Sequence, residues 1–286
     1  MYEHFYALRE KPFALNPDPA YLYLAKRHRY ALTMLEYAIS QASGFALITG
    51  EVGCGKTTVV RHLLARAGGE LNVGFITNAH PGFGHLLPWL MEALGLEVGE
   101  TKPSEQFRSF VSHVKREYAQ GRRTVLVIDE AQNLGIAGLE ELRVLSNINV
   151  GKDLLVQTIV IGQPELRAML KLQALRQFAQ RIAMEYHLEA LQSNETAAYI
   201  LHRLSVAGSS SSLFAPETFD LIHYATRGIP RLINIVCDTA LVYGFADQAK
   251  CIDAEVIRQV VSDRGGILPL TALGAPTAPV FAQHVM

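Results

Sequence analysis

The residues from Gly50 to Thr57, GEVGCGKT, combine three glycines with a lysine and a threonine at the spacing GxxxxGK[ST]. They follow the apolar run FALIT (45–49) and precede the helical pattern TTVVRHLLARA. In this context, successive backbone N–H groups and a helix N-terminus can surround phosphate oxygens. Lys56 adds a positive charge to the same oxygens, and the Thr57 hydroxyl suits Mg²⁺. The alternative is a glycine-rich turn with a surface lysine.

We expect the whole loop to contact a nucleotide, ATP, together with the residue that follows it. The expected contacts are Gly50, Glu51, Val52, Gly53, Cys54, Gly55, Lys56, Thr57 and Thr58. Cys54 occupies a position that the motif leaves free. We therefore expect an alkylating reagent at Cys54 to crowd the phosphates, and bound Mg-ATP to protect the thiol.

The apolar run TVLVID (124–129) ends with the carboxylate of Asp129, and a second carboxylate, that of Glu130, follows directly. Ligands of α/β sheets bind at the carboxyl ends of the strands, where Asp129 and Glu130 would lie. Asp129 is predicted to hold Mg²⁺ through its water shell, and Glu130 to polarise the attacking water. Alone, this pattern is often a strand leaving the core, but the phosphate loop favours the catalytic interpretation.

Apolar strand patterns alternate with helical patterns along the first two thirds of the chain. This alternation predicts a three-layer α/β domain with a parallel sheet over residues 43–189. The predicted strands are FALIT (45–49), NVGFIT (72–77), TVLVID (124–129), LLVQTIVIG (154–162) and AMEYHL (183–188).

The pattern changes after Leu188. Residues 190–265 carry helical patterns without a strand signal, which predicts a small all-helical domain. The tail, 266–286, mixes Gly, Pro and Ala without a period, and we expect it to be flexible. Residues 1–42 are predicted to form an N-terminal segment beside the nucleotide site.

Composition limits the class of protein. With 26 basic and 27 acidic residues in 286, the net charge is −1, which excludes the global basic excess of a protein that coats nucleic acid. The three cysteines form no CxxC motif, so neither a disulfide framework nor a zinc site is indicated. The longest apolar stretch, 232–246, is shorter than the about 20 residues of a spanning helix. We expect a cytoplasmic protein without a signal peptide or a transmembrane segment.

With both motifs placed, the chain resembles an AAA+ ATPase of the general secretion pathway protein A type, a group that includes ATPases encoded with pilus or exopolysaccharide export systems. The resemblance runs from residue 5 to residue 263, through GFALITGEVGCGKTT, VLVIDEAQNL, IVIGQPELR and GIPRLIN. It implies a P-loop AAA+ domain with a five-stranded parallel sheet, followed by a helical lid. Known members of the secretion type continue into a membrane span and a peptidoglycan-binding region, and neither follows here before Met286.

The resemblance assigns roles to three further residues. Gln163 stands at sensor 1, which orients water at the γ-phosphate; the alternative is a helix-capping glutamine before Pro164. Asn78 stands where AAA+ proteins often carry an asparagine that restrains the catalytic glutamate. The alternative is that Asn78 is an ordinary asparagine in a turn. Arg231 matches sensor 2, which reaches from the lid to the phosphates, although it could be a helix-surface arginine.

The resemblance also implies a nucleotide-dependent homo-oligomer with an arginine finger. Arg181 is the expected finger, Arg176 is the alternative, and a structural ion pair is a third interpretation. The segment KPFALNPDPAYLYL resembles the one that packs beside the adenine.

The first functional hypothesis is an oligomeric Mg-ATP-driven switch or motor that serves a cell-envelope export system, cytoplasmic or held at the inner face of the membrane by its partners. The second is an ATP-dependent DNA-binding regulator, such as a transposition accessory protein. The basic pairs Lys26-Arg27, Lys115-Arg116 and Arg122-Arg123 permit the second but are more often solvated helix faces. A third, a nucleotide-binding scaffold without turnover, disagrees with the Asp129-Glu130 pair.

Overall fold

A computed structural model describes residues 1–16, 18–41, 44–77, 82, 84–99, 102–209, 212–265, 268–271 and 273. The chain forms two compact units. One contains Leu24–Glu189, and the other contains Met1–Tyr23 together with Ala190–Met286. The segment expected over residues 1–42 is thus divided between the two units. No helix in the described part of the chain is long and apolar enough to cross a membrane.

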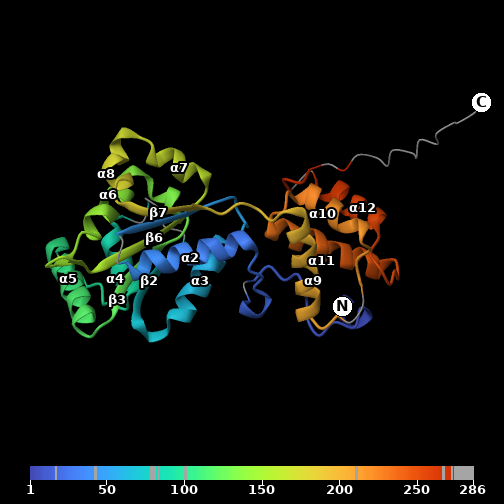
Figure 1. Ribbon diagram of the computed structural model, residues 1–286, viewed down its shortest axis with the longest axis horizontal. Helices are drawn as coiled ribbons and strands as arrows, with labels where there is room; N and C mark the ends of the chain where they lie inside the picture. The colour runs from blue at the N-terminus through green and yellow to red at the C-terminus, as the bar shows by residue number, and fades with distance from the viewer. Residues whose placement is uncertain are drawn as a thin grey trace, which may run out of the picture. The chain divides into compact units, whose positions relative to one another are not determined.

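The first unit is built on a parallel sheet with the strand order β2-β3-β6-β1-β7 (Figure 1). This confirms the predicted five-stranded α/β fold. Strands β1, β3 and β6 are buried along almost their whole length, as the continuous apolar runs predicted. The strands are β1 (Phe45–Thr49), β2 (Leu71–Ile76), β3 (Arg123–Ile128), β6 (Val156–Gly162) and β7 (Ile182–His187).

Helices cover both faces of this sheet (Figure 1). The core on one face joins alternate residues of β1, β3 and β6 to five helices: α4 (Leu86–Ala93), α5 (Pro103–Ala119), α6 (Gly135–Leu145), α7 (Pro164–Leu170) and α8 (Arg176–Ala179). On the other face, α2 (Lys26–Ser40) and α3 (Lys56–Ala67) pack against β1, β2 and β7. A short antiparallel hairpin of β4 (Asn149–Val150) and β5 (Asp153–Leu154), which was not predicted, follows α6.

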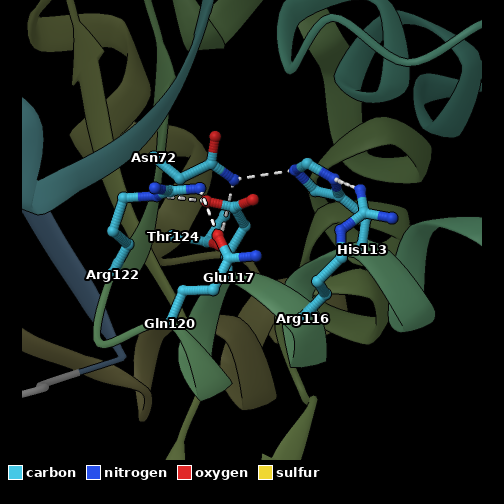
Figure 2. A network of polar contacts seen from close by, with 7 residues as sticks. All are labelled: Asn72, His113, Arg116, Glu117, Gln120, Arg122 and Thr124. Atoms are coloured by element: carbon cyan, nitrogen blue, oxygen red, sulfur yellow. Dashed lines mark hydrogen bonds and ion pairs between the residues drawn. The ribbon is translucent and has the colours of Figure 1, made fainter.

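A polar cluster lies where β2 and β3 begin and α5 ends (Figure 2). His113 is buried, with its Nε2 2.9 Å from the Asn72 amide and its Nδ1 2.9 Å from the Arg116 guanidinium. A guanidinium can only donate, so Nδ1 accepts this hydrogen bond from Arg116. Nearby, the buried carboxylate of Glu117 accepts a 2.6 Å hydrogen bond from Arg122 Nε. The cluster therefore fastens α5 to the start of the sheet.

The second unit is helical, as expected for residues 190–265. Its main helices are α9 (Ser193–Val206), α10 (Glu217–Thr226), α11 (Pro230–Ala246) and α12 (Ala254–Arg264). The short helix α1 (Tyr2–Phe5) and the turn at Pro19–Tyr21 complete it.

Long-range contacts join the first 23 residues to these helices. The Tyr2 hydroxyl donates to Asp238 of α11, and Arg203 of α9 donates to the Pro12 carbonyl. At the other end of the chain, the Thr271 N–H donates to the Ala225 carbonyl of α10 over 2.8 Å. Thr271 belongs to the tail that we expected to be flexible from its composition, and composition gave no indication of this contact.

Candidate nucleotide-binding site

The phosphate loop connects β1 to α3, and its backbone requires glycine at two positions. A Cβ on Gly50 would lie 2.3 Å from the Leu188 carbonyl oxygen. Gly55, the N-cap of α3, has a φ of 94° in the left-handed region, which favours glycine. The predicted strand–loop–helix arrangement is therefore present, with the loop backbone and the first turn of α3 at the carboxyl end of β1.

Lys56 is buried within this loop, with 5% of its surface exposed. Its Nζ donates to the carbonyl oxygens of Gly50 over 2.8 Å and Glu51 over 2.9 Å. These contacts compensate for the burial of the ammonium group, because a buried charge is tolerated when it is hydrogen-bonded. They also hold the charge inside the loop, where phosphate oxygens would meet it.

The second motif adjoins the first directly. The Thr57 hydroxyl, in the first turn of α3, donates to Asp129 Oδ2 over 2.7 Å. Asp129 follows β3, where its N–H donates to the Ile76 carbonyl of β2 over 2.9 Å. Burial raises the pKa of the Asp129 carboxyl group, while the hydrogen bond from Thr57 acts in the opposite direction. A hydroxyl and a carboxylate oxygen are hard ligands, so the pair suits Mg²⁺.

Glu130 lies beside this pair with an unusual backbone, since its φ of 52° is rare for a residue with a side chain. Its Oε2 accepts two hydrogen bonds, one of 2.9 Å from Gln163 Nε2 and one of 2.6 Å from Gln132 Nε2. The structure thus brings Glu130 and Gln163 together from the ends of β3 and β6. Two neutral donors fix the carboxylate without neutralising it.

Gln132, which was not predicted from the sequence, also lies at this site. Its Oε1 also accepts from the Gln163 N–H over 3.2 Å, so one amide bridges the catalytic candidate and the end of β6. A Cβ on Gly162 would lie 3.0 Å from the same oxygen, which leaves little room for a larger residue. In the sequence, Gln132 is one polar residue two positions after Glu130, and its role follows only from the 3-10 turn at Ala131–Leu134.

The hydrogen bonds described above do not include the other predicted site residues. Asn78 lies outside the described residues. Arg181 is half-buried and donates to the Arg143 carbonyl over 3.0 Å, which satisfies part of its guanidinium within its own unit. Arg176 is exposed at the start of α8.

Arg231 belongs to the helical unit, where it is exposed in the first turn of α11. The turn before this helix is closely packed against the backbone at Leu191. Gly228 has a φ of 70°, and a Cβ there would lie 2.0 Å from the Leu191 carbonyl oxygen. The Leu191 N–H donates to the Gly228 carbonyl over 3.0 Å. This turn fixes the start of the helix that carries Arg231.

Comparisons with known proteins identify the domain that carries this candidate site. The AAA domain family matches residues 39–170. The chain is 40% identical over 247 residues to general secretion pathway protein A of Aeromonas hydrophila. That match covers 86% of this chain and 45% of the relative, so the chain spans about half of the relative's length.

Among solved structures, the Aeropyrum pernix ORC2 protein, in ADPNP-ADP complexes, is similar with a TM-score of 0.67 and 16% identity, over 93% of this chain and 73% of that one. The Aeropyrum pernix ORC1 protein in complex with DNA is similar with a TM-score of 0.63 and 20% identity, over 89% and 69%. At these identities the likeness concerns the fold alone. The family match and the sequence relative agree: residues 39–170 form an AAA domain, and the chain is a relative of general secretion pathway protein A.

Proposed function

We propose that this protein is a Mg²⁺-dependent ATPase that works as an oligomeric switch or motor in the assembly or operation of a cell-envelope export system. One observation carries the chemical part of the proposal: Thr57, Asp129, Glu130 and Gln163 converge at the carboxyl edge of the sheet beside the phosphate loop. The export role rests on the relative named general secretion pathway protein A.

The site residues divide the chemistry among themselves. Loop N–H groups and Lys56 would hold the β- and γ-phosphates, and Thr57 with Asp129 would hold Mg²⁺. The metal, when bound, supplies charge that offsets the negative charge of the phosphate oxygens. Glu130 accepts hydrogen bonds through one carboxylate oxygen and can orient a water molecule with the other. Gln163, which contacts Glu130, is placed to report whether a γ-phosphate is present.

The oligomeric part of the proposal concerns the arginines. A finger arginine acts across an interface, where its charge offsets charge that develops in the transition state. We propose that ATP promotes self-association, that Arg181 or Arg176 completes a neighbour's site, and that Arg231 contacts the phosphates from the lid. Light scattering with a non-hydrolysable analogue tests the association. Arg176→Ala and Arg181→Ala, assayed alone and mixed with Glu130→Gln subunits, identify the finger as the variant that regains hydrolysis only in the mixture.

DNA binding is the alternative, and the contacts of the basic pairs weigh against it. At least four of the six side chains already bind groups of the same unit, which reduces their availability for phosphates of a nucleic acid. The contacts are Arg27 with Glu189, Arg116 with His113, Arg122 with Glu117, and Arg123 with the Ile39 carbonyl.

A pull-down from the native cell tests the biological part of the proposal. The bait is Glu130→Gln, which should bind ATP without hydrolysing it and so prolong ATP-dependent complexes, and the matched control is Lys56→Ala. Recovery of export components with the trap alone supports a cytoplasmic protein held at the membrane by its partners. Recovery of DNA and a transposase would replace this function with the alternative.

A further inference from the structure

His28 is a polar residue that lies outside both motifs yet reaches the phosphate loop. It projects from the buried face of α2, where 5% of its surface is exposed. That face also carries Ala31, Leu32, Leu35 and Ala38, at the spacing of a helix packed on a core. Helix α2 packs against α3, which follows the loop. A polar ring on such a face requires a specific partner, because burial of an unsatisfied polar group is unfavourable.

The partner is the backbone of the loop. His28 Nε2 lies 3.0 Å from the carbonyl oxygen of Cys54. Because a carbonyl only accepts hydrogen bonds, the ring must donate, and Nε2 carries the proton. The ring also lies close to Gly55, where a Cβ would be 3.2 Å from Nε2 and 3.6 Å from Cδ2. His28 thus binds Cys54 and fills the space beside Gly55.

This contact fixes the direction of one N–H group. In a planar trans peptide, the C=O and N–H bonds point in opposite directions. A Cys54 carbonyl held by His28 therefore directs the Gly55 N–H away from α2. Among the residues that the structure describes, this N–H has no acceptor. Gly55 has a φ of 94° and lacks a Cβ, so little steric restraint fixes this peptide apart from the hydrogen bond.

We propose that His28 is a positioning residue for phosphate binding: its hydrogen bond to Cys54 holds the Gly55 N–H in the direction in which it donates to a phosphate oxygen. This rests on the proposed ATP binding. The free loop is pre-organised by the bond, so less ordering accompanies nucleotide binding. The interaction also makes α2, which precedes the sheet, a part of the nucleotide site.

The variant His28→Phe tests the hydrogen bond, because it keeps a ring on the same face without a donor. His28→Gln restores an N–H donor. Leu35→Ala, on the same face two turns further along α2, is the control for packing, since it removes core contacts without touching the loop. We measure hydrogen exchange of residues 50–57 in nucleotide-free protein, together with the Kd of a fluorescent ATP analogue.

We expect faster exchange at the Cys54 amide, which donates to the Glu51 carbonyl, and roughly tenfold weaker binding in His28→Phe, the effect of one lost hydrogen bond. His28→Gln should stay within about twofold of the wild type, and Leu35→Ala should lower Tm but not affinity. Wild-type loop exchange in His28→Phe, or equal losses in His28→Gln and His28→Phe, would overturn the role. If the wild type itself binds no nucleotide, the proposed function fails, and the exchange comparison still decides on His28.

Discussion

The Thr57 hydroxyl donates a 2.7 Å hydrogen bond to Asp129, although 72 positions separate the two residues along the chain. Thr57 comes from the first turn of α3, and Asp129 follows β3. The contact therefore joins the two motifs that were predicted separately. It also gives each a function that neither has alone, since one hydroxyl or one carboxylate is a poor site for Mg²⁺.

Asp129→Asn should make the ligand-free protein more stable while removing its response to Mg²⁺. Burial raises the pKa of Asp129, so its ionised form destabilises the fold above the folded-state pKa, and a neutral amide relieves this. The measurement is Tm at pH 7 without ligand, followed by titration of Mg²⁺ with nucleotide. The control is Asp247→Asn, an exposed aspartate, which should change neither. A Tm of Asp129→Asn below that of the wild type would contradict the destabilising effect of the buried carboxylate.

Gln132→Leu should lower kcat by about tenfold and leave the Kd for ATP unchanged. The substitution removes one of the two donors that hold Glu130, and about 1.4 kcal/mol of lost positioning corresponds to this factor. Steady-state hydrolysis and analogue binding separate the two quantities. Asn133→Ala, at an exposed neighbouring position, should be neutral. If binding falls in parallel with kcat, Gln132 supports the fold of the site rather than the position of Glu130.

Cysteine labelling should be fastest at Cys251, which is exposed, and not at Cys54. Only 1% of Cys54 is exposed, and burial raises the pKa of its thiol to about 11. The predicted protection of Cys54 by Mg-ATP is therefore replaced by low reactivity with or without nucleotide, roughly 100-fold below Cys251. Mass spectrometry of iodoacetamide time courses measures this. Rapid labelling of Cys54 in the free protein would show that the loop opens.

Stability should fall as the pH drops below about 6.5, the ordinary pKa of histidine. Burial lowers the pKa of His113 in the folded protein, so the unfolded chain binds the proton more readily in this range. The urea concentration at the midpoint of unfolding should decrease between pH 8 and pH 5, and this decrease should be smaller in His113→Gln. A further loss below about pH 4.5 follows from Glu117, whose pKa Arg122 lowers. Equal slopes in the variant and the wild type would exclude His113 as the cause.

The sequence predicted the sheet and the phosphate loop because both are local patterns. The buried strands are almost continuous apolar runs, and the loop spacing follows from backbone geometry around phosphate. The bridge made by Gln132 depends on the positive φ of Glu130, which no local pattern specifies. The contact from His28 depends on how α2 packs. The division of the N-terminal segment depends on pairs such as Tyr2 and Asp238, which lie 236 positions apart.

The measurement that tests the central claim most directly compares nucleotide binding with phosphate release in Lys56→Ala and Glu130→Gln. Lys56 supplies the charge inside the loop, so its loss should abolish ATP binding. Glu130 accepts hydrogen bonds from Gln132 and Gln163 and has its proposed role in water activation, so Glu130→Gln should bind ATP like the wild type and lose hydrolysis. Equal loss of binding in both variants, or full hydrolysis by Glu130→Gln, would contradict the division of roles at this site.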